Sequence, residues 1–296
     1  LMTLPEKKRQ PNLLLAAMRH LFGISPSWDH FRGTLLLNPH PVRSVMLSHS
    51  TQTNEPARCA TLLPVLAQLP QPLALIEVGA SAGLCLLPDF YGYDYGGTVI
   101  RPATIEIEPP VFTCWVSETT PVPTAMPEIV WRAGLDLNPL DAANPAEAAW
   151  LETLVWPEQA DRLANLGAAL KIAAVQKPRL LRGDLLGNRL PQLCREAPKS
   201  ATLVIFHTAV LAYVEDQAER RVFAERVMSL CQYWLSNEAP NLFPEVARRV
   251  EARGVPGRFL LSVNGIPVAW TDPHGASLEW IACQDWVPAS KEPSVG

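Results

Sequence analysis

A glycine-rich turn directly after a continuous apolar run is the feature of this sequence most suited to chemistry. Residues 73–78 read LALIEV and residues 79–83 read GASAG. Glycine allows positive φ and lets a ligand approach the backbone closely, and the N–H groups at the start of a following helix can bind polar ligand groups. The spacing predicts a buried strand, a ligand-binding turn and then a helix. The candidate binding residues are Glu77, Gly79, Ser81 and Gly83.

The turn resembles the nucleotide-binding loop of Rossmann-like S-adenosylmethionine-dependent methyltransferases, in which a glycine is commoner than Ser81. That resemblance implies a second acidic residue at the end of the next strand, where a carboxylate can accept from both ribose hydroxyls. Asp136, in IVWRAGLDLNP, has the matching context, and Asp184, in RGDLL, has the position near the adenine. The resemblance therefore implies S-adenosylmethionine as the cofactor.

The distance between the two parts of this motif is unusual. Asp136 follows Gly83 by 53 residues, where about 20 is usual for a dinucleotide fold. An insertion at about residues 89–118 accounts for the difference, and Glu106 or Glu108 are alternative partners for the ribose.

The same turn also matches the G-x-S-x-G pattern of a hydrolase nucleophile elbow. Ser81, Asp184 and His274 follow the chain order of the α/β-hydrolase triad, with His207 as another possible base. The order of elements disfavours this interpretation, because an elbow follows several strands and the first 72 residues look helical. A third interpretation is a glycine turn that serves only the packing of a strand against a helix.

Other polar residues lie where a substrate would bind. His207 and Thr208 follow the apolar run LVIF, and Glu238 follows WLS, so all three emerge at carboxyl ends of predicted strands. The neutral-range pKa of histidine suits His207 to act as general base, with Thr208 and Glu238 contacting the acceptor. Asn54 and Arg58, at the start of a predicted helix, either cap that helix or close over a ligand.

The elements that must position these residues indicate an α/β fold. Apolar runs alternate with helical patterns from residue 73 onward, which predicts a Rossmann-like, mainly parallel sheet. A helical lead-in is expected over residues 1–72, with one helix at 11–22 and another that begins at Asn54 and Pro56. Residues 73–296 form the main domain, which carries an inserted β element at about 89–118 and ends in an antiparallel strand pair.

The composition and net charge limit the classes of partner that the chain is expected to bind. Apolar residues make up 48% of the chain and charged residues 18%, and the formal net charge is −4. This balance disfavours nucleic acid and membrane surfaces and favours a small-molecule substrate. The six cysteines form no C-x-x-C pair, so we expect reduced thiols, a cytoplasmic location and neither a zinc site nor any other metal. No pattern in the sequence indicates the oligomeric state.

Eight segments in order resemble an uncharacterised bacterial family known as domain of unknown function 2332. The resemblance covers about residues 11–281, and part of that family's N-terminal region is expected to be missing. The segments are TQTNEPARCATLLP, LIEVGASAGL, YGYDYGG, GLDLNPLD, VWPEQADRL, RGDLL, VIFHTAVLAYV and PHGASLEW.

The expected function is methyl transfer from S-adenosylmethionine to a small molecule. The alternatives are a non-catalytic nucleotide-binding or scaffold protein with a degenerate loop, and a serine hydrolase that uses Ser81.

Overall fold

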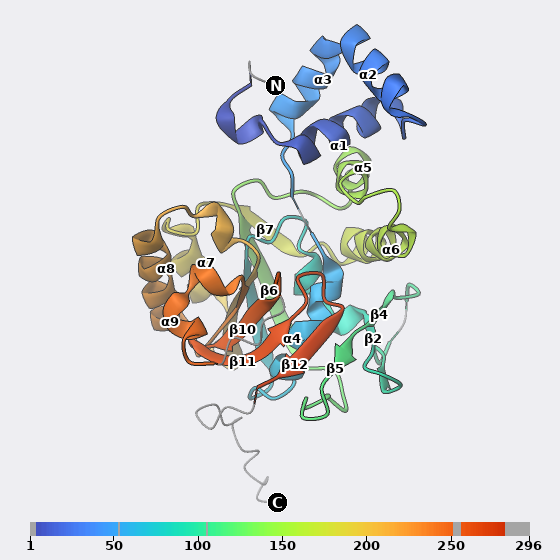
Figure 1. The fold of residues 1–296 in the computed structure, drawn as a ribbon. Coiled ribbons are helices and arrows are strands. Elements are labelled where there is room, and N and C mark those ends of the chain that lie inside the picture. The colour runs from blue at the N-terminus through green and yellow to red at the C-terminus, as the bar shows by residue number, and fades with distance from the viewer. Residues whose placement is uncertain (1–3, 53, 105, 251–255, 282–296) are drawn as a thin grey trace, which may run out of the picture.

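The computed structural model describes residues 4–52, 54–104, 106–250 and 256–281. Its largest element is a nine-stranded sheet with a parallel core (Figure 1). The core strands are β1 (Leu73–Val78), β6 (Ile129–Asp136), β7 (Arg179–Arg182), β8 (Thr202–Thr208) and β9 (Tyr233–Glu238).

The core strands lie in the order β7-β6-β1-β8-β9, and every neighbouring pair is parallel. The chain therefore starts in the middle at β1, adds β6 and β7 on one side, and then adds β8 and β9 on the other. This is a doubly wound order with its topological switch point between β1 and β8. The predicted Rossmann-like, mainly parallel sheet is confirmed.

The C-terminal strands continue the sheet beyond β9 with antiparallel pairing. β10 (Phe259–Val263) pairs antiparallel with β9 and with β11 (Ile266–Thr271), and β12 (Ser277–Trp280) pairs antiparallel with β11. The predicted antiparallel pair is confirmed and gains a third strand. β5 (Trp115–Val116) completes the sheet edge in parallel with β12.

The inserted β element is also confirmed. β2 (Gly92–Asp94), β3 (Val99–Ile100) and β4 (Val111–Thr113) form a separate sheet in the order β3-β2-β4. Its tyrosines are buried, and their hydroxyls donate to backbone carbonyls of the surrounding core: Tyr91 to Leu84, Tyr93 to Pro88 and Tyr95 to Ala60. The insertion thus lengthens the chain between Gly83 and Asp136 without separating β1 from β6.

The alternation of side chains along β1 divides the core between its two faces. Leu73 and Leu75 pack on the side of α4 (Cys59–Leu66) and α6 (Ala160–Gln176). Ala74, Ile76 and Val78 pack on the opposite side. That side is covered by α7 (Arg189–Glu196), α8 (Gln217–Leu230) and α9 (Pro244–Ala247).

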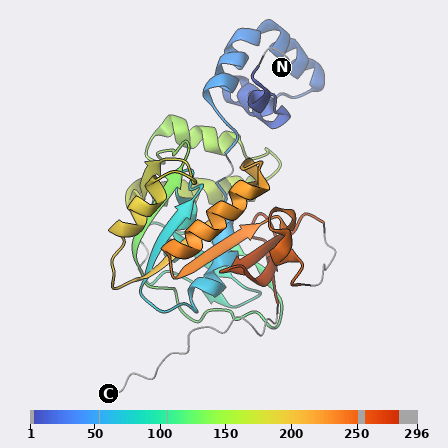
Figure 2. The same ribbon diagram turned by 90° about the vertical axis from the view of Figure 1, so that its left-hand side faces the viewer.

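Three N-terminal helices form a group beyond one end of the sheet, as Figures 1 and 2 show. They are α1 (Pro11–Phe22), α2 (Trp28–Leu37) and α3 (Pro39–Ser48). The helix predicted over 11–22 is confirmed, whereas α2 and α3 occupy a stretch for which no helix was predicted. Trp150, from α5 (Pro145–Thr153), is buried among their apolar side chains. Within the described ranges, no helix combines the length and the apolar character needed to cross a membrane.

Candidate functional site

The predicted binding residues lie at the carboxyl ends of adjacent parallel strands. Glu77 is the penultimate residue of β1, Asp136 ends β6, and Asp184 follows β7 by two residues. Thr208 ends β8 and Glu238 ends β9. Ligands of open α/β sheets bind at this edge, at the switch point. The fold therefore gathers the candidate residues on the edge where a ligand is expected.

The glycine turn adopts the backbone conformations that its sequence suggests. Gly79, Ser81 and Gly83 have φ values of 77°, 50° and 72°, all in the left-handed region. Two short 3-10 helices follow, Leu84–Leu86 and Pro88–Phe90, so the prediction of a regular helix here is wrong. Pro88 explains the difference, because it disfavours helical backbone at the preceding residue and lacks an N–H.

The turn uses most of its backbone donors inside the protein. The N–H groups of Gly79 and Ala80 donate to the Leu135 carbonyl of β6, at 2.8 and 3.3 Å, and Gly83 N–H donates to the Ala80 carbonyl at 2.6 Å. A Cβ at residue 79 would lie only 2.7 Å from Cβ of Val210. Gly79 thus accommodates the loop after β8, and a ligand would have to approach the turn from another side.

Asp136 holds the glycine turn against β6. Its Oδ2 accepts from the N–H of Ser81 at 2.8 Å, and its Oδ1 accepts from the N–H of Asn138 at 2.7 Å. Each carboxylate oxygen has a further lone pair. Contact with a ribose stays a prediction for this residue.

Three buried side-chain oxygens at this edge lack hydrogen-bond partners within the described part of the chain: Glu77 Oε2, Ser81 Oγ and Glu238 Oε2. The first two lie beside the turn, on residues that are only 4% and 5% exposed. Burial raises the pKa of Glu77 well above its usual value, Cys85 and Asp136 raise that pKa further, and Arg58 opposes the shift. Glu77 is therefore a neutral carboxylic acid over a pH range in which an exposed glutamate is charged.

His207 is engaged on both ring nitrogens and is fully buried. Its Nδ1 lies 2.7 Å from Oε1 of Glu238, and its Nε2 lies 3.0 Å from Nε1 of Trp234, which donates. Glu238 Oε1 also accepts from the N–H groups of Val210 and Leu211. These contacts favour a structural role in which His207 and Glu238 fix the loop after β8, and a catalytic role for His207 stays a prediction.

The segment 54–58 links the glycine turn to the C-terminal strands. Asn54 Nδ2 donates to the Ala80 carbonyl at 3.1 Å, while Glu55, not the expected Asn54, caps the following turn by accepting from the N–H of Ala57. Arg58 donates from Nε to the Pro273 carbonyl at 2.7 Å and from Nη1 to the carbonyl and hydroxyl of Thr208. Arg58 thus joins the end of β8 to the turn between β11 and β12.

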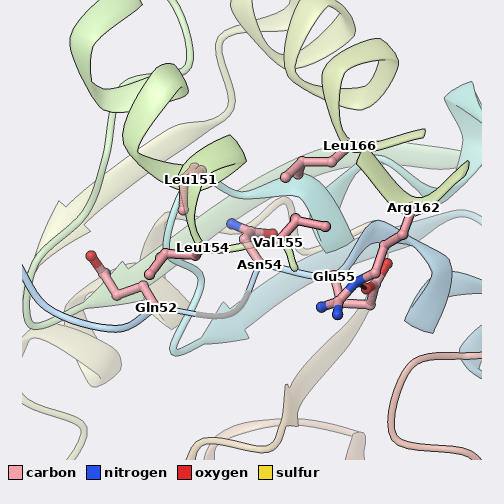
Figure 3. Close-up of a pocket in the computed structure, with 8 residues that line it drawn as sticks. All are labelled: Gln52, Asn54, Glu55, Leu151, Leu154, Val155, Arg162 and Leu166. Atoms are coloured by element: carbon pink, nitrogen blue, oxygen red, sulfur yellow. Dashed lines mark hydrogen bonds and ion pairs between the residues drawn. The ribbon is translucent and has the colours of Figure 1, made fainter. Parts of the chain in front are cut away.

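A charged cluster that sequence reasoning missed lies on the same segment. The buried carboxylate of Glu55 pairs with Arg162 of α6 (Figure 3). Its Oε2 also lies 3.7 Å from Nδ1 of His274. The pKa of Glu55 is lowered: burial raises it, but His274 and Arg162 outweigh burial. No local signal reveals this cluster, because its members lie more than 100 residues apart in the sequence.

Two neighbouring cavities adjoin this cluster. A small one of about 20 Å³ has room for roughly one water molecule. Figure 3 shows apolar side chains of α5 and α6 and the paired Glu55 and Arg162 around it. A larger groove of about 500 Å³ lies between α1 and the connection from α5 to α6, and Arg162 and His274 line it.

The structure does not assemble a hydrolase triad from the predicted residues. Ser81 Oγ contacts neither His207 nor His274, since it has no hydrogen-bond partner among the described residues. Asp184 Oδ1 accepts from the N–H of Leu186 and so closes its own turn. The left-handed φ of Ser81 is compatible with an elbow, but no base among the described residues hydrogen-bonds to its hydroxyl.

The comparisons place the chain in one family. No curated protein and no solved structure matches it. One family model matches, described as uncharacterized protein conserved in bacteria (DUF2332), and the match covers residues 2–280. Because it spans nearly the whole chain, the protein belongs to the DUF2332 family of bacteria.

Proposed function

We propose that the chain binds S-adenosylmethionine at the switch point and transfers its methyl group to a small molecule. The observation that carries this proposal is the pair of unpartnered buried oxygens, Glu77 Oε2 and Ser81 Oγ, beside Asp136 at the carboxyl ends of β1 and β6. Buried polar atoms are costly without a hydrogen-bond partner. Such atoms at the switch point of a doubly wound sheet fit a polar ligand there.

The three side chains offer complementary groups to a nucleoside cofactor. Glu77, as a neutral acid, can donate one hydrogen bond and accept others, and the Ser81 hydroxyl can do both. These two would hold the methionine part. Asp136 keeps a spare lone pair on each oxygen for the ribose hydroxyls, and Asp184, two residues after the next strand β7, would contact the adenine.

When bound, the cofactor supplies a methyl carbon that is activated by a positively charged sulfur. The protein's part is mainly positioning, since holding an acceptor in line with the methyl group lowers the barrier by several kcal/mol. Glu77, Ser81 and Asp136 therefore need only bind and orient the cofactor.

The contact between Gly79 and Val210 supports the scaffold alternative. Val210 occupies the space beside Gly79 through which a ligand would reach that glycine, and two hydrogen bonds to Glu238 and Trp234 immobilise His207, which adjoins this loop. A protein that only retained the fold would show this filling. Cofactor binding decides between the two functions.

Calorimetric titration with S-adenosylmethionine and S-adenosylhomocysteine tests the proposal. We expect micromolar binding to the wild type and at least a tenfold loss in Ser81→Ala and Asp136→Asn. Glu128→Gln serves as a matched control, because this exposed glutamate directly precedes β6, at the opposite end of the strand from Asp136. No binding to the folded wild type at millimolar ligand would overturn methyl transfer, and labelling of Ser81 by a fluorophosphonate would favour the hydrolase.

A further inference from the structure

We propose that the groove between α1 and the α5–α6 connection is the site of the methyl acceptor. The acceptor class is a neutral small molecule with an apolar body and a hydroxyl group, and His274, supported by Glu55, takes the hydroxyl proton. This inference rests on the proposed function for the transfer itself, although binding to the groove can be tested without it.

The size and lining of the groove suit an apolar body. Its volume is about 500 Å³, within the range of roughly 300–1,000 Å³ typical of small-molecule sites. Leu15 and Met18 of α1 and Phe31 of α2 line it from the N-terminal helices, and Leu154 and Trp156 line it from the other side. An aromatic or aliphatic ring system would bury its surface between these two walls.

The charges around the groove favour a neutral ligand. Arg19 and Arg162 line it together with Glu158, and Glu55 lies beside it in the adjoining cavity. Arg19 donates to the carbonyls of Thr153 and Val155, and Arg162 pairs with Glu55. Two positive and two negative side chains balance, so the groove has no net charge that would select an acidic or a basic ligand.

His274 is the group in this groove that is suited to receive a proton. Its side chain is 51% exposed, and Nδ1 lies 3.7 Å from Glu55 Oε2. Within the described residues, Nε2 makes no hydrogen bond. A carboxylate on one side of an imidazole stabilises the cation that forms when the other nitrogen accepts a proton.

The turn that carries His274 is held rigidly. Asp272 Oδ1 accepts from the N–H groups of His274 and Ala276, and Arg58 donates to the Pro273 carbonyl. Gly275 packs so closely on the Ala57 carbonyl that a Cβ would clash with it. A base must keep its position relative to the substrate, and these contacts provide that.

One short segment of the chain contacts both His274 in the groove and the glycine turn. Glu55 contacts His274, and the adjacent Asn54 donates to the carbonyl of Ala80, next to Ser81. With the cofactor bound, the acceptor oxygen would form its bond to the methyl carbon as the sulfur–methyl bond breaks and leaves its electron pair on sulfur. The hydroxyl proton would move to Nε2 of His274, and the products would be a methyl ether, the neutral thioether and one proton.

Methyl NMR of protein labelled with ¹³C-methyl methionine tests the site directly. Met18 lines the groove, and Met18→Leu identifies its signal among the five methionines of the chain. The probes are 2-naphthol and its methyl ether, which differ only in the methyl group that replaces the hydroxyl hydrogen, titrated without cofactor. We expect both to shift the Met18 signal, with 2-naphthol bound about fivefold more tightly.

Two variants distinguish the contribution of the ligand's apolar body to binding from the contribution of its hydroxyl group. Trp156→Ala should weaken both probes several-fold, whereas His274→Gln should abolish the preference for 2-naphthol and leave the ether unaffected. His40→Gln, on the exposed side of α3, is the control and should change neither. An unmoved Met18 signal overturns the groove as the site, and equal binding of both probes by the wild type overturns the role of His274. Neither result depends on whether S-adenosylmethionine binds.

Discussion

At the scale of single residues, the buried carboxyl of Glu77 makes stability depend on pH. Its pKa in the folded protein lies above the unfolded value of 4.5, so the folded state holds a proton that the unfolded state releases. Between these two values, its contribution to the free energy of unfolding falls as pH rises, by about 1.4 kcal/mol per pH unit. The stabilising contribution is complete below pH 4.5 and is lost as pH approaches the folded pKa.

Glu77→Gln removes this titration while keeping a neutral side chain of the same size. We expect the variant to gain stability relative to the wild type as pH rises above about 5, measured by urea unfolding at each pH. Glu128→Gln should show no such trend, because Glu128 is exposed. A difference between Glu77→Gln and wild type that stays constant over this range would contradict the buried neutral acid.

Ser81 combines two costs at one position. Its φ of 50° is unfavourable for a residue with a side chain, and its buried Oγ has no described partner. Ser81→Gly removes both costs and should raise the free energy of unfolding by roughly 1–2 kcal/mol, visible as a higher Tm. Ser81→Ala removes only the hydroxyl and should gain less. A Ser81→Gly variant less stable than the wild type would show that this conformation is not strained.

At the scale of elements, Glu238 joins β9 to the loop after β8. One of its oxygens accepts from His207 Nδ1 and from two backbone N–H groups. Glu238→Ala would leave three donors unpaired, two of them buried and one partly buried, and should cost at least about 3 kcal/mol. Glu238→Gln keeps an acceptor oxygen and should cost less.

Hydrogen exchange provides the measurement for this contact. The amides of Val210 and Leu211 should lose protection in Glu238→Ala before the strands do. Glu225→Ala, on the exposed side of α8, is the control. Unchanged exchange at Val210 and Leu211 would show that Glu238 does not hold the loop.

Local sequence patterns predicted secondary structure correctly where the hydrophobic pattern fits only one kind of element. The apolar runs of β1 and β8 are buried on both faces, so they read as strands without ambiguity. The prediction failed after the glycine turn, where LCLL suggests a helix. Pro88 ends the helical turn there, and the three tyrosines that follow are buried in and beside the small sheet. The prediction also missed α2 and α3, although Ser27 caps the first and Pro39 opens the second.

At the scale of the whole molecule, the candidate site depends on contacts that no local pattern contains. Asp136 meets Ser81 across 55 residues, and Arg58 meets Pro273 across 215. The sequence predicted that acidic residues would meet at the carboxyl edge, because parallel strands force this. It could not predict that Asp136 caps the turn or that His274 reaches Glu55, since both depend on how loops pack in three dimensions.

The N-terminal helices form one wall of the proposed acceptor groove, and Trp150 attaches them to α5. Its indole is 2% exposed, packs among side chains of α1 and α3, and donates from Nε1 to the Ser50 carbonyl at 3.0 Å. Trp150→Ala should cost about 3–5 kcal/mol in the attachment of these helices, and calorimetry should show them melting at a lower temperature than the sheet. Trp28 is 69% exposed, so Trp28→Ala should leave the melting temperatures of the N-terminal helices and of the sheet as they are in the wild type.

The same variant separates the two ligand sites. Because Glu77, Ser81 and Asp136 belong to the sheet and its turn, S-adenosylhomocysteine should bind Trp150→Ala as it binds the wild type. The 2-naphthol probe should lose its affinity, because the wall that contains Leu15 and Met18 is displaced. Joint loss of both ligands would instead mean that the N-terminal helices support the switch point itself, and that acceptor and cofactor share one indivisible site.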